Sequence, residues 1–191
     1  MFGNEENNFN NIPITEIGEH CKVQGGYAFR SKDFTEEGIR LVQIGNVNKD
    51  SLDWEVINYL PMDFAKYYPD YLLKNEDLLI AMTRPIIKSI DCVKIAMVSD
   101  KDIPSLLNQR VGRFMVDENI INKTFLLSLL KMRNFKIYVD KMSGNSLQPN
   151  ISSKQIEEYK IPVPPLELQN QFADFVTQVN KSKFVVTAKF Q

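Results

Sequence analysis

The chain has 191 residues, of which 43% are hydrophobic and 25% charged, and its charged side chains leave a net charge of −1. These totals predict one globular domain with a full core and room for one appended element, and they exclude a chain that is disordered over most of its length. The near-neutral net charge, taken alone, argues against a nucleic-acid partner.

The first residues predict neither export nor membrane insertion. The opening MFGNEE lacks a basic region followed by an apolar core, and no apolar run approaches the ~20 residues of a membrane helix. We therefore expect a cytoplasmic protein in which Cys21 and Cys92 stay reduced. The polar residues 1–11 predict a flexible lead-in.

The first half of the chain contains mostly strand-like patterns. Residues 12–17 lead into a turn at Gly25 and Gly26, and Pro61 is placed to open a short helix over 61–68. Runs rich in branched and apolar residues predict strands over 39–47, 77–83, 92–98 and 112–117.

The second half contains helical patterns. Residues 121–142 are predicted to form one helix of about five turns, with Asn122 as its N-cap. The apolar positions of this helix are 125, 126, 129, 130 and 137. Ser152 and Gln155 fit a capping box that opens a short helix through residue 158. The prolines of the following YKIPVPP segment predict extended chain.

A last helix is predicted from Pro165 onward. Its apolar residues follow 4-3-4-7 spacing, with Ser182 at the missing position, which gives a heptad-like stripe. The stripe consists of Leu168, Phe172, Phe175, Val179 and Val186. Two interpretations stay open: a terminal helix packed on its own domain, or a projecting helix that binds a partner. The whole pattern predicts an α+β fold, with a mixed-sheet domain over 12–164 followed by a helix over 165–191.

Several kinds of chemistry have no residues to support them. The single histidine, His20, is followed by Cys21, and neighbours on a strand point to opposite faces, so a catalytic pair is not expected. One histidine and two cysteines cannot complete a structural zinc site. No phosphate-binding loop and no dinucleotide fingerprint occurs. The sequence therefore predicts no catalytic site, no metal and no cofactor.

The distribution of charge is more informative than its sum. Residues 80–113 carry six basic and three acidic side chains, and residues 120–160 carry seven and three. A neutral total can therefore hide a basic face, although scattered and solvated charge fits the same counts. The uncharged run SGNSLQPNIS at 143–152 is rich in neutral hydrogen-bonding groups. Such groups suit either a plain surface loop or a segment that reads the edges of bases.

Several stretches, in this order, resemble one known family. They are GGYAFRSKDFTEEGIRLVQIGNVN at 25–48, NEDLLIAMT at 75–83, LLNQRVGRF at 106–114 and SGNSLQPNISSKQIEEYKIPVPPLELQNQF at 143–172. The chain is similar to one half of the DNA-specificity subunit of type I restriction-modification systems. The last stretch resembles the end of a target recognition domain that runs into the conserved-region helix.

The resemblance implies a non-catalytic subunit that recognises double-stranded DNA. In the family, two target recognition domains each read half of a split site, and two long helices hold them apart and dock the adenine methyltransferase subunits. A nuclease-translocase subunit joins for restriction. This chain has one recognition domain, and its helix stops at Gln191. We therefore expect a half-subunit that dimerises, a recombination cassette or a truncated form.

The resemblance also directs attention to polar loops as DNA contacts, because basic groups position a protein on phosphates and amides or hydroxyls specify bases. The predicted contacts are Arg30, Ser31, Lys32, Thr83, Arg84, Lys88, Gln109, Arg110, Arg113, Gly144, Asn145, Ser146 and Gln148. For each group the alternative is a solvated loop or a buried amide that pairs with the backbone. The stripe of the last helix is the predicted subunit interface.

Two further hypotheses fit the same residues. In one, the chain is an enzyme fragment, namely the recognition domain of a fused restriction-methylation enzyme or a small nuclease. In the other, it is a decoy that occupies methyltransferase subunits without reading DNA. Metal-dependent nicking would favour the first, and basic groups scattered around the surface would favour the second.

Overall fold

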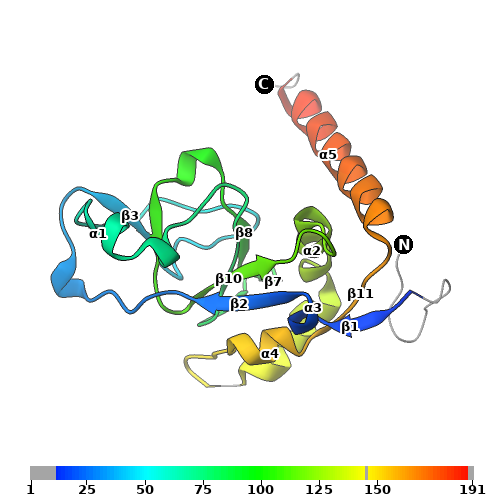
Figure 1. The fold of residues 1–191 in the computed structure, drawn as a ribbon, viewed down its shortest axis with the longest axis horizontal. Coiled ribbons are helices and arrows are strands. Elements are labelled where there is room, and N and C mark those ends of the chain that lie inside the picture. Colours follow the sequence, from blue (N-terminus) through cyan, green and yellow to red (C-terminus); the bar gives the residue numbers. More distant parts are fainter. Residues whose placement is uncertain (1–11, 145, 189–191) are drawn as a thin grey trace.

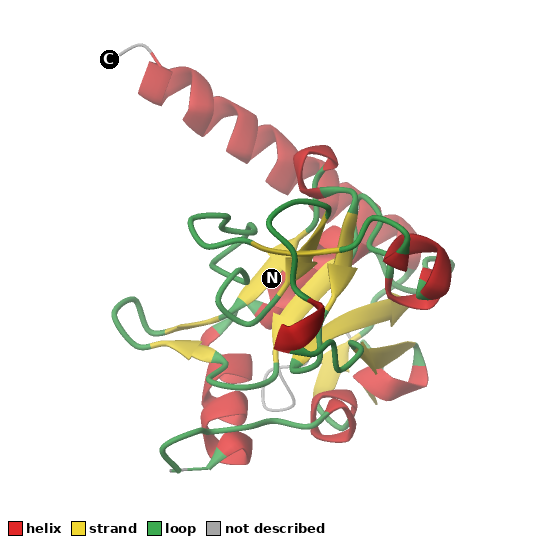
Figure 2. Cartoon of the chain, turned by 90° about the vertical axis from the view of Figure 1, so that its left-hand side faces the viewer, coloured by secondary structure: helices red, strands yellow, loops and turns green. Residues whose placement is uncertain are grey.

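A computed structural model describes residues 12–144 and 146–188, with side chains placed as far as residue 180. The predicted lead-in at 1–11 and Asn145 lie outside the described residues. The described chain mixes several sheets with helices, which confirms the predicted α+β class. Figures 1 and 2 show strands grouped in the body of the molecule, helices around them, and a last helix that projects away.

A four-stranded antiparallel sheet forms the centre, in the order β2-β10-β5-β8. Its strands are β2 (Cys21–Gly25), β10 (Val111–Val116), β5 (Leu78–Ala81) and β8 (Ile95–Met97). Strands β5 and β10 confirm the predictions over 77–83 and 112–117. The predicted strand over 92–98 is divided between β7 (Cys92–Val93) and β8, because the chain leaves one sheet and enters another.

The apolar run in β5 is continuous because both faces of the strand are covered. Leu78 and Ile80 pack into a core beneath the helices, whereas Leu79 and Ala81 pack into a second core on the other face of the sheet. Side chains alternate between the faces of a strand, so a strand buried on both sides contains no polar alternation.

A second sheet has the order β4-β3-β9, in which β3 pairs antiparallel with β4 and parallel with β9. Its strands are β3 (Ile39–Val42), β4 (Asn58–Leu60) and β9 (Ser105–Leu107). The predicted strand over 39–47 was too long. The buried Asn46 accepts a hydrogen bond from the Gln43 backbone N–H at 2.9 Å, and its own backbone N–H donates to the Gln43 carbonyl at 2.9 Å, which folds the chain into a turn.

The remaining elements before α5 are short. Strand β1 (Ile14–Glu16) pairs with β11 (Lys160–Pro162), and β6 (Ile86–Ile87) pairs with β7. The short helix predicted over 61–68 is α1 (Phe64–Tyr67), which begins after Asp63 and not at Pro61. Single 3-10 turns occupy Ile17–Glu19, Ser31–Asp33, Pro69–Tyr71 and Asp100–Asp102.

The predicted helix over 121–142 is two helices, α2 (Lys123–Leu130) and α3 (Arg133–Ser143). The Asn122 N-cap is confirmed, since its side chain accepts from the backbone N–H groups of residues 124 and 125. The break comes at Met132, whose backbone is extended. An unbroken helix would turn Ile137 toward the core. The break instead buries Phe135 and Val139 and leaves Ile137 51% exposed.

Helix α4 (Ser153–Glu157) begins at Ser152 with the predicted capping box. The Glu157 carboxylate accepts a hydrogen bond from the Val23 backbone N–H at 2.8 Å and forms an ion pair with Lys22 at 3.3 Å. These contacts fix α4 against β2, so the polar run before α4 lies at the edge of the central sheet (Figure 1).

Helix α5 (Leu166–Ala188) starts at the domain and then leaves it (Figure 1). Gln169 is fully buried at its base. The Gln169 amide donates to the carbonyls of Ile120 and Pro164 at 2.9 and 2.8 Å and accepts from the Asn122 backbone N–H at 3.0 Å. The first turn of α5 is therefore fixed by hydrogen bonds to the segment that leads into α2.

Among the described residues, no helix is both long and apolar enough to cross a membrane. Cys21 and Cys92 are free thiols, as expected, and burial raises the pKa of Cys21 to about 12.

Candidate nucleic-acid interface

Three segments that are distant in sequence meet beside the end of β5. Thr83 and Asn150 form an isolated antiparallel bridge, and the Thr83 hydroxyl donates to the Asn150 side-chain oxygen at 2.5 Å. One Arg110 nitrogen, Nη1, donates to the same two side chains at 3.3 and 3.2 Å. We call Thr83, Arg110 and Asn150 the junction. It joins segments that the sequence predicted only as separate polar groups.

The turn that carries Gln109 and Arg110 is held against the chain that leaves β2. The Gly26 backbone N–H donates to the Val111 carbonyl at 3.1 Å, and the Gln109 N–H donates to the Tyr27 carbonyl at 2.8 Å. A Cβ atom on Gly26 would lie 2.2 Å from the Asn108 carbonyl oxygen, so only glycine allows this approach. The Gln109 and Arg110 side chains are exposed, with Arg110 at a φ of 73°.

The uncharged run is anchored on both sides of its tip. The Arg84 N–H donates to the Pro149 carbonyl at 2.8 Å, and the Asn150 N–H donates to the Ser143 carbonyl at 3.2 Å. The described residues at the tip, 144 and 146–148, are exposed. A pocket of about 350 Å³ lies beside the junction and is lined in part by Ser152 and Gln155.

Ion pairing separates the basic residues into two groups. Lys123, Lys131 and Lys136 each lie within 2.8 Å of a carboxylate oxygen, so acidic neighbours offset their charge. Within the described residues, Arg84, Lys88 and Arg110 form no ion pair. Burial and then the positive charge of Arg84 lower the pKa of Lys94. Positive charge therefore remains available around the junction.

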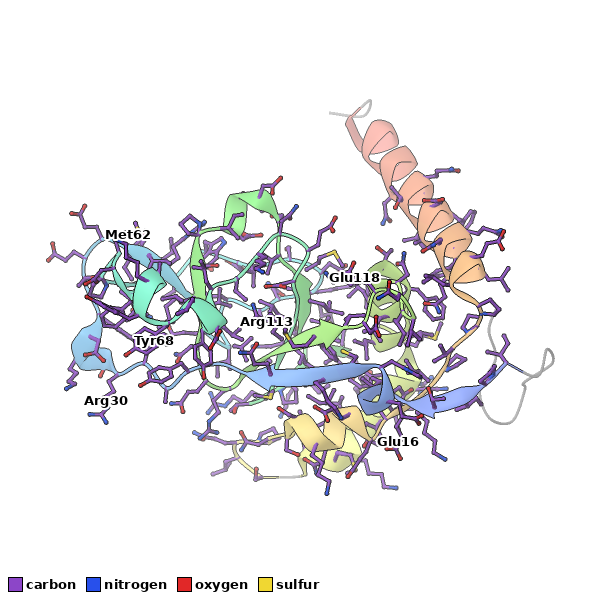
Figure 3. All side chains as sticks on the ribbon, in the orientation of Figure 1. Glu16, Arg30, Met62, Tyr68, Arg113 and Glu118 are labelled. Carbon is purple, nitrogen blue, oxygen red and sulfur yellow. The ribbon has the colours of Figure 1, made fainter. Side chains whose placement is uncertain are left out.

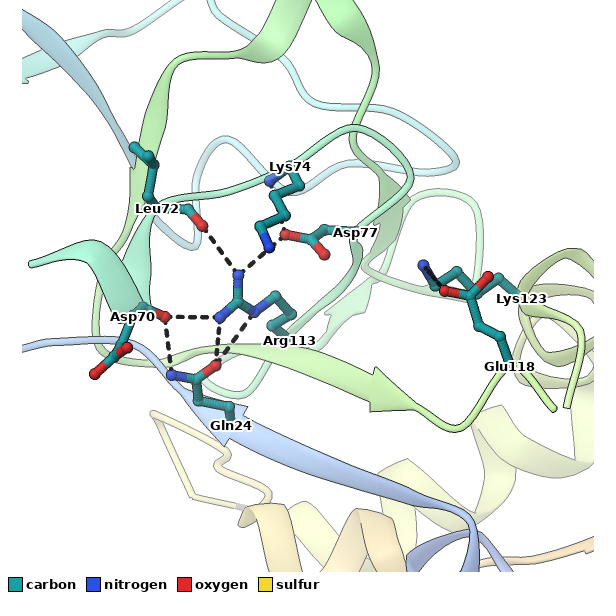
Figure 4. A network of polar contacts seen from close by, with 8 residues as sticks. All are labelled: Gln24, Asp70, Leu72, Lys74, Asp77, Arg113, Glu118 and Lys123. Atoms are coloured by element: carbon teal, nitrogen blue, oxygen red, sulfur yellow. Dashed lines mark hydrogen bonds and ion pairs between the residues drawn. The ribbon is translucent and has the colours of Figure 1, made fainter. Parts of the chain in front are cut away.

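Arg113 does not lie with the other predicted contacts. It is 6% exposed, and its guanidinium donates to the Gln24 side chain, to the carbonyls of Asp70 and Leu72, and to Asp77 (Figure 4). The ion pair with Asp77 spans 3.1 Å. All its nitrogens are engaged inside the protein, so the prediction that Arg113 contacts DNA is replaced by a structural role.

The remaining predicted contacts lie on two other loops and at the tip of the uncharged run. Arg30, Ser31 and Lys32 are exposed at a 3-10 turn, and Arg30 points outward at the end of the molecule remote from α5 (Figure 3). Lys88 is exposed in the hairpin loop between β6 and β7. Gly144 ends α3 with a φ of 74°, and Ser146 and Gln148 are exposed at the tip.

The stripe of α5 is divided between two environments. Leu168 is 45% exposed and Phe175 is 58% exposed. Phe172 instead packs on its own domain, with its ring edge-on to Phe125 at 5.8 Å. Val179 is half-buried, and the side chain of Val186 lies outside the described residues. Part of the stripe thus serves the domain, and part stays available to a partner.

Asn150 was not among the predicted contacts, although it lies in the uncharged run. Its position in the sequence marks a polar loop, but its contact with residues 83 and 110 appears only in three dimensions. Among the described residues, no group of three or more His, Cys, Asp or Glu side chains is arranged to hold a metal ion.

Comparison with known proteins shows to which family the chain belongs. The family described as "Type I restriction modification DNA specificity domain" matches residues 10–189. The chain belongs to this type I DNA specificity family. It is 34% identical over 167 residues to the MjaVIII specificity subunit of Methanocaldococcus jannaschii, covering 87% of this chain and 39% of that protein. It is 32% identical to the EcoAI specificity subunit of Escherichia coli, covering 91% of this chain and 30% of that subunit.

Solved structures share the fold of this specificity-family chain. The HsdS subunit from Thermoanaerobacter tengcongensis aligns with a TM-score of 0.66 at 15% identity, over 98% of this chain and 42% of that one. The type I S subunit from M. genitalium aligns with a TM-score of 0.61 at 14% identity, over 90% of this chain and 40% of that one. The chain thus spans well under half the length of these relatives.

The structure predicts opposite roles for two arginines. Arg113→Met should lower the free energy of unfolding by about 3–5 kcal/mol, because it breaks a largely buried ion pair with Asp77 and removes the donors to the Leu72 carbonyl and the Gln24 side-chain oxygen. Arg84→Asn, at an exposed site with a φ of 49° that asparagine tolerates, should change it by less than about 0.5 kcal/mol. Urea unfolding measures both values. A stable Arg113→Met protein would contradict the structural role.

Proposed function

We propose that this chain reads one half of a split double-stranded DNA site as the specificity component of a type I restriction-modification complex. The observation that carries the proposal is the junction. It brings Arg84, Arg110 and the uncharged tip at 146–148 to one place in a chain of the DNA specificity family.

The two kinds of side chain at this place suit two tasks. Arg84 and Arg110 would contact phosphates, which position the protein and release counterions, and Lys88 would do so from the neighbouring β6–β7 loop. Ser146 and Gln148 would contact base edges, where a good bidentate pair is worth about 1–3 kcal/mol of discrimination. Arg30, Ser31 and Lys32 would extend the contact along the duplex, and Gln109 lies beside Arg110 on the same turn.

Recognition of this kind needs no chemistry from the chain itself. We propose a non-catalytic, cytoplasmic subunit that directs adenine methyltransferase subunits to the site, with the nuclease subunit joining through the complex. Because the chain spans well under half of its relatives, the second half-site would be read by another recognition domain. A second copy of this chain is one such domain.

The exposed part of the α5 stripe would provide the contact for assembly. Leu168 and Phe175 leave apolar surface on a helix that projects from the domain, and such surface is typical of helix–helix contacts. The partner would be a methyltransferase subunit or the equivalent helix of a second recognition domain.

Methylome sequencing tests the proposed function. A methylation-free bacterial host expresses the cognate methyltransferase subunit with or without this chain. We expect a methyladenine motif that appears only with the chain, and a palindromic split motif if two copies assemble. The double variant Arg84→Asn/Arg110→Asn should lose the motif, because it removes positive charge that no described ion pair offsets, while asparagine tolerates both backbone conformations.

The matched control is Lys101→Ala, which removes an exposed positive charge from the 3-10 turn next to Arg40. This variant should keep the motif. A soluble wild-type chain that copurifies with the methyltransferase subunit but yields no motif would contradict the proposed function.

A charge on α5 should separate assembly from folding. Phe175→Glu should abolish copurification with the partner subunit and leave the melting temperature within about 2 °C of the wild type, since the ring is mostly exposed. Phe172→Glu should lower the melting temperature as well, because its ring packs on Phe125. Pull-down and thermal unfolding check both. Unfolding of Phe175→Glu, or unchanged assembly, would contradict the proposed interface.

A further inference from the structure

The tip of the uncharged run carries an apolar side chain in full contact with solvent. Leu147 is 99% exposed, whereas the next most exposed large hydrophobic side chain among the described residues, Val56, is 72% exposed. Burial of a leucine side chain contributes about 1.5–3 kcal/mol relative to exposure. At this position the leucine gains none of this free energy in the folded domain, so its burial remains available to a bound partner.

The chain on the C-terminal side of Leu147 is held in place by backbone and side-chain hydrogen bonds. The Asn150 side-chain amide donates to the Gln148 carbonyl at 2.6 Å, and the Pro149 carbonyl accepts from the Arg84 N–H at 2.8 Å. On the other side, the Ser143 carbonyl accepts from the Asn150 N–H at 3.2 Å, which closes the loop. The loop is thus supported at its base and presents Leu147 outward.

The surroundings of Leu147 indicate an anionic partner. Residues 141–156 include Lys141 and Lys154 and contain no Asp or Glu. Arg84 and Arg110, which form no ion pair among the described residues, lie at the base of the same loop. Leu147 is thus an apolar side chain surrounded by neutral and basic groups. A DNA duplex has an anionic exterior and an apolar stacked interior, so it fits these surroundings better than an apolar groove on a protein does.

We propose that Leu147 enters the base stack at one step of the DNA half-site and partly unstacks it. The inference rests on the proposed function, because it needs the junction to face DNA. Apolar side chains, leucine among them, act as such wedges in other DNA-binding proteins, at an unstacking cost of a few kcal/mol. The cost is lowest at pyrimidine–purine steps, so Leu147 would favour TA or CA/TG steps without any hydrogen bond to a base.

The test uses the assembled complex with the methyltransferase subunit and a duplex carrying the motif found by methylome sequencing. The adenine analogue 2-aminopurine, whose fluorescence rises on unstacking, replaces each half-site adenine in turn, apart from the methylated one. We expect the wild-type complex to raise the fluorescence at one step. Leu147→Ala should abolish that rise and weaken binding about tenfold. Leu147→Met, which keeps a long apolar side chain, should retain both.

Gln148→Ala is the matched control on the same loop, because it removes a polar contact and should weaken binding without removing the fluorescence rise. Duplexes with uracil in place of each thymine separate the wedge from a simple contact with a thymine methyl group. If one such replacement weakens wild-type binding as much as Leu147→Ala does, and the two losses do not add, the wedge is wrong.

Three other outcomes would overturn the proposed insertion of Leu147. Wild-type binding with no fluorescence rise at any step would overturn the wedge and leave the proposed function standing. Loss of methyltransferase association in Leu147→Ala would assign the residue to a protein contact instead. Absence of any DNA binding by the wild-type complex would overturn the proposed function and the wedge together.

Discussion

Strand β10 connects the structural centre of the protein to the proposed recognition surface. It pairs with β2 on one side and β5 on the other, so it fixes the central sheet. The carbonyl of its first residue, Val111, accepts a hydrogen bond from the Gly26 N–H. The carbonyl of the preceding residue, Arg110, accepts one from the Met82 N–H at 2.7 Å. The junction is therefore an extension of the sheet. Loops placed in this way combine variable side chains with a rigid support.

Two arginines near β10 differ in the same way as the sheet and the loops that extend it. Arg113, in the middle of β10, is buried and shares its donors with Asp77, Gln24 and two carbonyls (Figure 4). Arg110, three residues earlier, reaches the surface and uses one nitrogen in the junction. Arg113 thus stabilises the fold, whereas Arg110 leaves positive charge at the surface. The near-neutral net charge of the chain does not reveal this separation.

The features that could be predicted from the sequence are those that depend on neighbouring residues. The Asn122 cap, the capping box at Ser152 and the apolar run of β5 are local, and each is present. The break at Met132 and the burial of Arg113 depend on tertiary packing, which periodicity does not report. For the site, the sequence predicted polar segments one by one. Their meeting at the junction needs long-range pairing between residues 83, 110 and 150.

Hydroxyl-radical footprinting of the assembled complex, with and without its target duplex, tests most directly whether the junction faces DNA. It reports the solvent contact of individual side chains. DNA should protect Leu147 and the segments around Arg84 and Arg110, while Met62, which is 59% exposed and lies across the end of the domain from Arg30 (Figure 3), should stay reactive. Protection at Met62 with unchanged reactivity at Leu147 would mean that another face of the domain binds DNA.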